Sequence, residues 1–345
     1  MALRAEILSQ PHVLAEQLER TLPQVRRIAS ELRRATFDFV FLVARGSSDN
    51  AGLYAKYLWG AHNGLPVALA APSLFTHYQR PPRVARALVV GISQSGQSPD
   101  LVHVMTQCRA QGAVTVAIVN DAGSPLAHAA QHVIELGVGA ELAVAASKTY
   151  TAQLFAVAML SVAFEGAATR ERELNQVPGF VEQTIALEPL LAQAAERYRA
   201  IEQCVVLGRG FNFASAYEWS LKLKELCYVL AAAYSAADFL HGPIAVVARG
   251  FPIFAVVPDG AVRRELVDLL TRLRDEQFAE LVVVSNDDAA LALGHTQIPL
   301  PVALPEWLSP IVSIVPAQLF TYYLARAKGL DPDQPRGLEK VTRSW

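Results

Sequence analysis

The stretch FVFLVARGSS at residues 39–48 joins a five-residue apolar run to an Arg-Gly turn and two serines. A short apolar run bounded by a turn predicts a buried strand, and the pattern after it predicts a helix. The stretch CVVLGRGFN at residues 204–212 repeats this arrangement. Gly46 and Gly210 hold the same place in the two stretches. The helices are expected over 51–59 and 214–230.

A second set of patterns repeats with nearly the same offset along the chain. Leu101 and Leu266 begin two similar helical patterns, and Asn120 and Asn286 end the apolar runs that follow them. A constant offset over several elements predicts an internal duplication. Strands that alternate with helices predict parallel sheets covered on both faces. The fold expected is therefore α/β, with two doubly wound parallel-sheet domains in tandem. The strand, helix and strand expected in each copy cover 87–92, 101–109 and 114–120, and 251–257, 266–274 and 281–286.

We expect four segments along the chain, with a helical stretch over about 165–199 joining the two domains. In doubly wound sheets, ligands bind at the carboxyl ends of the strands, near the switch in strand order. Functional residues are therefore expected just after the apolar runs. The segments are an N-terminal helical segment (1–36), a first domain (37–180), a second domain (181–330) and a C-terminal tail (331–345).

The composition excludes several classes of protein. Of 345 residues, 30 are basic and 32 acidic, and no basic block occurs, so no nucleic-acid partner is expected. The three cysteines show no CxxC or Cys/His spacing, which predicts neither a zinc site nor disulfides; no metal or cofactor is expected. The N-terminus lacks the apolar core of a signal peptide, and the apolar stretch 307–325 contains two prolines, so we expect a buried segment rather than a membrane span. These features predict a cytoplasmic protein.

The strongest local signal is the loop SQSGQS at residues 93–98, between a predicted strand and a predicted helix. Hydroxyl groups, a flexible glycine and the free N–H groups of a helix start form an anion cradle. The loop lacks the lysine of a nucleotide P-loop, and neither domain contains a GxGxxG fingerprint. This pattern favours one phosphate monoester. Ser47 and Ser48 follow the first strand in the same way, and the small-residue loop 139–149 would allow close approach of a ligand.

For the other polar residues, spacing alone favours a structural role over a catalytic one. Glu218, Lys222 and Glu225 lie on one helical face, which is typical of a solvated ion-pair stripe. His241 is a lone histidine in a turn, and Lys340 lies near the terminus, where exposed lysines are common.

Six motifs occur in the order found in tandem sugar isomerase (SIS) proteins: residues 46–48, 93–98, 145–148, 221–225, 241–243 and 333–336. The chain resembles the isomerase half of glutamine:fructose-6-phosphate aminotransferase over nearly its whole length. It resembles SIS-type glucosamine-6-phosphate deaminases more closely, through ARGSSD, ISQSG-x-SPD and GL-x-KVT at residues 44–49, 92–100 and 337–342. The resemblance implies that each domain is a flavodoxin-like three-layer sandwich.

The resemblance also implies roles for single residues. Glu225 matches the carboxylate that moves a proton between C1 and C2 of the open-chain sugar, and Lys222 matches a supporting lysine. His241 matches a histidine that assists ring opening and reaches into the neighbouring subunit's site, which implies a homodimer with shared active sites. Lys340 matches a lysine that forms a Schiff base with the sugar carbonyl. The sugar-phosphate site is implied to contain Ser47, Ser48, Ser93, Gln94, Ser95, Ser98, Val144 and Ala145.

The activity expected from the resemblance is that of an amino-sugar phosphate deaminase/isomerase, with glucosamine 6-phosphate as the first expected substrate and fructose 6-phosphate and ammonia as products. Ala2 follows Met1, where the aminotransferase has its glutaminase cysteine, and this favours free ammonia. Alternatives are an isomerase subunit served by a separate glutaminase, a galactosamine- or fructosamine-6-phosphate deaminase, and a non-catalytic sugar-phosphate sensor. Ser47, Ala146 and Glu339 depart from the aminotransferase pattern, which has Thr, Ser and Ala there, and leave the substrate open.

Overall fold

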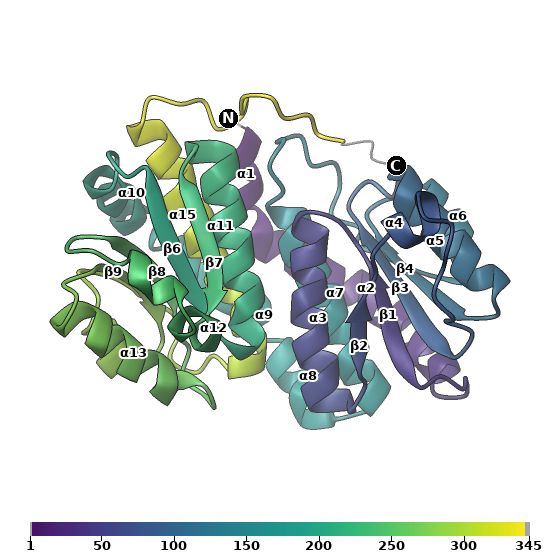
Figure 1. Ribbon diagram of the computed structural model, residues 1–345. Coiled ribbons are helices and arrows are strands. Elements are labelled where there is room, and N and C mark those ends of the chain that lie inside the picture. The colour runs from purple at the N-terminus through teal and green to yellow at the C-terminus, as the bar shows by residue number, and fades with distance from the viewer. Residues whose placement is uncertain (1, 342–345) are drawn as a thin grey trace. The chain divides into compact units, whose positions relative to one another are not determined.

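A computed structural model describes residues 2–341 and divides them into two compact units. The first unit comprises residues 12–141, 148–175 and 339–341, and the second comprises 2–11, 142–147 and 176–338. Each unit contains one five-stranded sheet (Figure 1). In both sheets every pair of neighbouring strands is parallel, which confirms the expected tandem α/β fold.

The sheet of the first unit has the strand order β2-β1-β3-β4-β5. The order reverses between β1 and β3, so the loops that follow these two strands lie at the switch point, where such sheets bind ligands. The strands are β1 (Phe39–Val43), β2 (Val67–Leu69), β3 (Ala87–Ser93), β4 (Val114–Val119) and β5 (His132–Glu135).

Helices cover both faces of this sheet (Figure 1). On one face, Phe41 and Val89 pack with Phe75, Val104 and Leu126 from three helices. On the other, the indole of Trp59 donates to the carbonyl of Val157, which joins two further helices. The helices are α2 (Gln10–Leu32), α3 (Ser47–Asn63), α4 (Ser73–Thr76), α5 (Pro99–Ala110), α6 (Pro125–Ala129), α7 (Lys148–Glu165) and α8 (Ala168–Leu174); only the first two residues of α2 belong to the second unit.

The sheet of the second unit has the order β10-β9-β8-β6-β7. Read from β7, its strands follow the same sequence of positions as the first sheet, so the predicted duplication extends to the topology. Gly46 and Gly210, which hold the same place in the two matching stretches, have φ angles of 56° and 59°. The strands are β6 (Gln203–Gly208), β7 (Leu230–Ser235), β8 (Pro252–Val256), β9 (Glu280–Ser285) and β10 (Thr296–Pro299).

One face of this second sheet carries an aromatic cluster in which Trp219, Phe254 and Phe320 meet with ring centroids 5.0–6.0 Å apart. The other face packs against α12, α13 and α14. The helical segments of this unit are α1 (Ala2–Leu8), α9 (Val177–Ile185), α10 (Glu188–Arg197), η1 (Gly210–Asn212), α11 (Phe213–Cys227), α12 (Ala236–Leu240), η2 (Pro243–Val246), α13 (Arg263–Asp275), α14 (Asp288–Leu291), η3 (Glu306–Leu308) and α15 (Ser309–Ala327).

The segment Glu306–Ala327 is long and apolar enough to cross a membrane, but 94% of its apolar window is buried inside the protein. It forms η3 and α15, and its Phe320 belongs to the aromatic cluster. Burial on all sides explains its composition, as expected for residues 307–325.

One detail of the expected elements is wrong. The helix expected over 214–230 ends at Cys227, and Leu230 already begins β7, where it pairs with Gln203 of β6. The left-handed conformation of Tyr228 (φ 57°) ends the helix and turns the chain into the strand. The expected joining stretch 165–199 is helical, and it is divided into α8, α9 and α10.

Candidate active site

The hydroxyl-rich loop follows β3 and leads into α5, as expected. Ser93 is buried at the end of the strand, and its Oγ accepts the N–H of Gly96 at 3.0 Å. Oγ of Ser95 accepts the N–H of Gln97 at 3.2 Å. Each oxygen accepts from the backbone, so its own hydrogen can be donated to another group.

Gly96 explains how this loop can be so tight. Its φ is +61°, and a Cβ at this position would lie 2.2 Å from Oγ of Ser124, so only glycine fits. Ser98 then precedes α5 in an extended conformation, with Pro99 as the first helical residue. Gln94, Ser95 and Ser98 are partly exposed. The loop therefore presents polar groups and the start of a twelve-residue helix, an arrangement that suits an anion.

The loop after β1 lies beside the first loop at the edge of the same sheet, because β1 and β3 are neighbours. Ser47 is partly exposed, whereas Ser48 is buried and accepts a hydrogen bond from Gln153 of α7 at 3.0 Å. Arg45 donates to the fully buried carboxylate of Asp100 at 2.9 Å from both Nε and Nη2. This ion pair, which the sequence reasoning missed, ties the two loops together.

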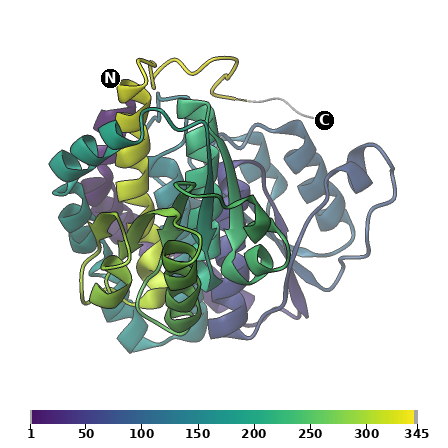
Figure 2. The ribbon, with the colours of Figure 1, turned by 60° about the vertical axis from the view of Figure 1, so that its left-hand side comes forward.

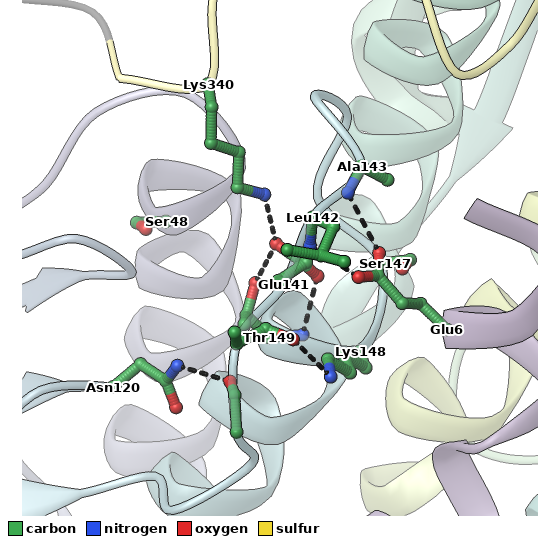
Figure 3. A network of polar contacts seen from close by, with 12 residues as sticks. Glu6, Ser48, Asn120, Glu141, Leu142, Ala143, Ser147, Lys148, Thr149 and Lys340 are labelled. Carbon is green, nitrogen blue, oxygen red and sulfur yellow. Dashed lines mark hydrogen bonds and ion pairs between the residues drawn. The ribbon is translucent and has the colours of Figure 1, made fainter. Parts of the chain in front are cut away.

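The tail lysine meets a buried carboxylate in the first unit (Figure 3). Nζ of Lys340 lies 2.6 Å from Oε2 of Glu141, whose side chain is fully buried. The same carboxylate accepts the N–H of Thr149 at 3.1 Å and its hydroxyl at 2.7 Å. Glu141 therefore joins the tail to the first turn of α7. In the sequence, Glu141 stands within a small-residue loop, and nothing local signals a partner 199 residues away.

Val144 and Ala145, also expected at the sugar site, belong to the second unit, because the chain changes units after Glu141. Val144 is partly exposed and Ala145 is buried. Their loop is held by Glu6 of α1, whose carboxylate accepts the N–H groups of Leu142 at 2.5 Å and Ala143 at 3.3 Å (Figure 3). Sequence reasoning also missed Glu6.

The ionic residues of α11 form a buried cluster instead of the solvated stripe that spacing alone favours. Nζ of Lys222 lies 2.5 Å from Glu225 and 3.4 Å from Glu218. The side chains of Lys222 and Glu218 are 3% and 0% exposed, whereas that of Glu225 is 22% exposed. Burial by itself would lower the pKa of Lys222, but the charges of Glu218 and Glu225 outweigh it and raise the pKa. Lys222 is therefore an ammonium that holds Glu225 at the accessible end of the cluster.

The remaining candidates are one histidine and three cysteines. His241 is exposed in the turn between α12 and η2, where Gly242 has a φ of 127°. Cys108, Cys204 and Cys227 are free and buried, and burial raises the pKa of Cys108 to about 12. Across residues 2–341, no three His, Cys, Asp or Glu side chains are arranged to hold a metal ion.

One unit has a polar loop at the switch point of its doubly wound sheet, and the other has a buried ionic cluster on α11. These features define a tandem α/β protein with a candidate anion site. The SIS domain matches residues 38–163 and 198–327, and the chain belongs to this family. This confirms the resemblance on which the site residues were inferred.

Two aminotransferases are similar to almost the whole chain. Glutamine–fructose-6-phosphate aminotransferase of Thermus thermophilus is 33% identical over 97% of this chain, and that of Gloeobacter violaceus is 34% identical over the same share. The chain spans 57% of the length of each.

Among solved structures, a candidate phosphosugar isomerase of Silicibacter pomeroyi DSS-3 matches with a TM-score of 0.87 and 31% identity, over 96% of this chain and 100% of that one. The C-terminal domain of glucosamine-fructose-6-phosphate aminotransferase of Francisella tularensis has a TM-score of 0.87 and 27% identity, over 97% and 98%. A glucosamine-6-phosphate deaminase of Thermotoga maritima shares the fold, with a TM-score of 0.82 and 23% identity over 100% of both chains.

Proposed function

We propose that the chain is a phosphosugar isomerase that acts on an amino-sugar 6-phosphate, glucosamine 6-phosphate first, and releases fructose 6-phosphate and ammonia. The observation that carries the proposal is the ionic cluster of α11, where the buried ammonium of Lys222 fixes the accessible carboxylate of Glu225. Moving a proton between two adjacent carbons requires a base held in one position beside the reacting atoms. Glu225 is assigned this role.

The proposed reaction has three steps. Glu225 takes the proton from C2 of the open-chain amino aldehyde and returns it to C1, while a second proton passes from the amine nitrogen to O1. The aldehyde thereby becomes an alcohol, and the amine at C2 becomes an imine. The amine of Lys340 attacks C2 and displaces ammonia. Water then releases the ketone and restores the lysine. Lysine serves in such exchanges because its amine forms imines with carbonyl carbons.

The far end of the substrate is assigned to the loops after β1 and β3. Ser47, Ser93, Ser95 and Ser98 would donate hydroxyl hydrogens to the phosphate, and the start of α5 would add its N–H groups. Binding at this end would use the phosphate to position C1 and C2, which do not themselves carry charge. Val144 and Ala145 are assigned to the sugar itself, and His241 to ring opening, because imidazole can both accept and donate a proton. We further propose a cytoplasmic homodimer in which His241 serves the partner's site.

A second candidate is the isomerase portion of an aminotransferase, which makes glucosamine 6-phosphate from fructose 6-phosphate with ammonia derived from glutamine. The aminotransferases that are 33% and 34% identical over 97% of the chain favour it. The two candidates use the same groups and differ in the direction of the reaction and the source of ammonia.

The test is a coupled assay of the purified chain with glucosamine 6-phosphate, in which fructose 6-phosphate and ammonium are both measured. We expect equal amounts of the two products. Galactosamine 6-phosphate and a fructosamine 6-phosphate form the substrate panel, and fructose 6-phosphate with ammonium or glutamine tests the reverse direction. Binding of these sugar phosphates without turnover of any of them would contradict the proposal and favour a sensor.

A further inference from the structure

The segment before Lys340 is fixed to the second unit in two places. The first is the start of α1, where the carboxylate of Asp333 accepts the N–H groups of Ala2 at 3.1 Å and Leu3 at 2.8 Å. Pro332 and Pro335, on either side, are both buried. Figure 2 shows the beginning of the tail beside the N-terminus, above the end of α15. The tail is therefore anchored well before it reaches the lysine.

The second anchor is Tyr228, the residue that ends α11. Its hydroxyl accepts the N–H of Arg336 at 2.8 Å, and its ring lies under the guanidinium of Arg336, 4.5 Å from centroid to Cζ. Tyr228 has a left-handed backbone (φ 57°), a conformation that residues other than glycine seldom adopt. Tyr228 lies between the last turn of α11 and β7, and its backbone conformation supports the contact of its side chain with Arg336.

We infer that Tyr228 and Arg336 are positioning residues that set where Lys340 acts. Tyr228 follows Glu225 by three residues, and Arg336 precedes Lys340 by four. The pair therefore connects the end of the helix that carries the base to the tail that carries the imine-forming amine. This inference rests on the proposed roles of Glu225 and Lys340.

Only a short length of chain lies between the anchor and Lys340, so the anchor strongly restricts the position of the lysine. Residues 337–339 are exposed, and only these three separate the Arg336 anchor from Lys340 along the chain. A short tether keeps a reactive group at a high effective concentration, and each residue released from an anchor adds conformations that must be lost before reaction. Loss of the pair should lower the rate of imine formation and leave phosphate binding unchanged.

The experiment compares Tyr228→Phe, Arg336→Ala and Arg336→Lys. Tyr228→Phe keeps the ring and removes the oxygen that accepts from Arg336, and Arg336→Ala removes the cation. Each should lower kcat by roughly two- to tenfold with KM nearly unchanged. Arg336→Lys should recover part of the loss because it restores a cation over the ring. Borohydride trapping of fructose 6-phosphate on Lys340, followed by mass spectrometry, should slow in parallel, and Tyr228→Phe should speed hydrogen exchange at the amide of residue 336.

Matched controls come from the same unit. Tyr217→Phe makes the same change on α11 away from the tail, and Arg249→Ala removes a cation from the ring of Phe278, where the pair lies 4.8 Å apart. Both should leave trapping and kcat unchanged. If Lys340→Ala abolishes turnover but the tail variants trap substrate at the wild-type rate, the positioning role is wrong and the proposed function stands. If Lys340→Ala keeps full activity, the proposed function itself fails.

Discussion

Nζ of Lys340 lies 2.6 Å from Oε2 of Glu141, although 199 residues separate them in the sequence. Glu141 also accepts from the N–H and hydroxyl of Thr149, so one buried carboxylate holds both the tail and the start of α7 (Figure 3). This contact holds the amine of Lys340 in one position.

Glu141→Gln should therefore lower kcat about tenfold, because a hydrogen bond to a charged group contributes roughly 1.5–3 kcal/mol and Lys340 is partly exposed. Steady-state kinetics measures the loss. Thr149→Val, which alters the other partner of Glu141, should reduce stability more than kcat. Equal kcat in wild type and Glu141→Gln would show that this carboxylate does not position the lysine.

Lys340→Ala and Glu225→Gln should each lower kcat by about 10² to 10⁴ with little change in substrate affinity, because both groups act on the reacting carbons. Turnover of glucosamine 6-phosphate and binding measured by calorimetry separate the two effects. Lys224→Ala, an exposed neighbour on α11, is the control. Near-wild-type rates in both variants would exclude the mechanism.

Ser93→Ala and Ser95→Ala should raise KM for the sugar phosphate about ten- to a hundredfold, since each removes a donor to a charged phosphate. Ser93→Ala should also lower the free energy of unfolding by about 1 kcal/mol, because its oxygen accepts from Gly96. Thr106→Val, on the exposed side of α5, should change neither quantity. An unchanged KM in both serine variants would place the phosphate elsewhere.

Lys222→Met should lower the free energy of unfolding by about 3–5 kcal/mol, because it leaves Glu218 buried without its ammonium. Chemical denaturation measures this loss, and Lys224→Met on the same helix should have little effect. The second change Glu218→Gln should recover part of the stability. A Lys222→Met protein as stable as wild type would mean that the cluster is hydrated in solution.

The stability of the protein should fall as the pH drops from about 6.5 toward 4. Burial, together with the charge of Arg170, lowers the pKa of His62 from 6.5 to about 4. The unfolded chain then binds a proton more readily than the folded one, so stability is full above pH 6.5 and is lost as the pH falls toward 4. His62→Gln should flatten this part of a melting-temperature profile, whereas His12→Gln, at an exposed site, should not.

Much of the architecture could be predicted from the sequence because it depends on local patterns. The apolar runs at 39–43 and 204–207, and the nearly constant offset between the repeated patterns, indicated two similar parallel sheets. Gly46, Gly210 and Gly96 marked the turns that need positive φ. The hydroxyl loop was recognisable because its serines, glycine and helix start are contiguous. The three-residue strand β2 was missed, because at an edge it carries too short an apolar pattern.

The fold class, the duplication and the types of residue at the candidate site follow from the order of residues along the chain. The surroundings of these residues depend on how the chain folds: Lys222 is buried between two carboxylates, Glu141 accepts from Lys340, and Tyr228 holds Arg336. Spacing along a helix shows which side chains share a face, but whether that face meets solvent depends on elements far away in the chain. The tail contacts join residues 108 and 199 positions apart, and such pairs leave no local pattern in either segment.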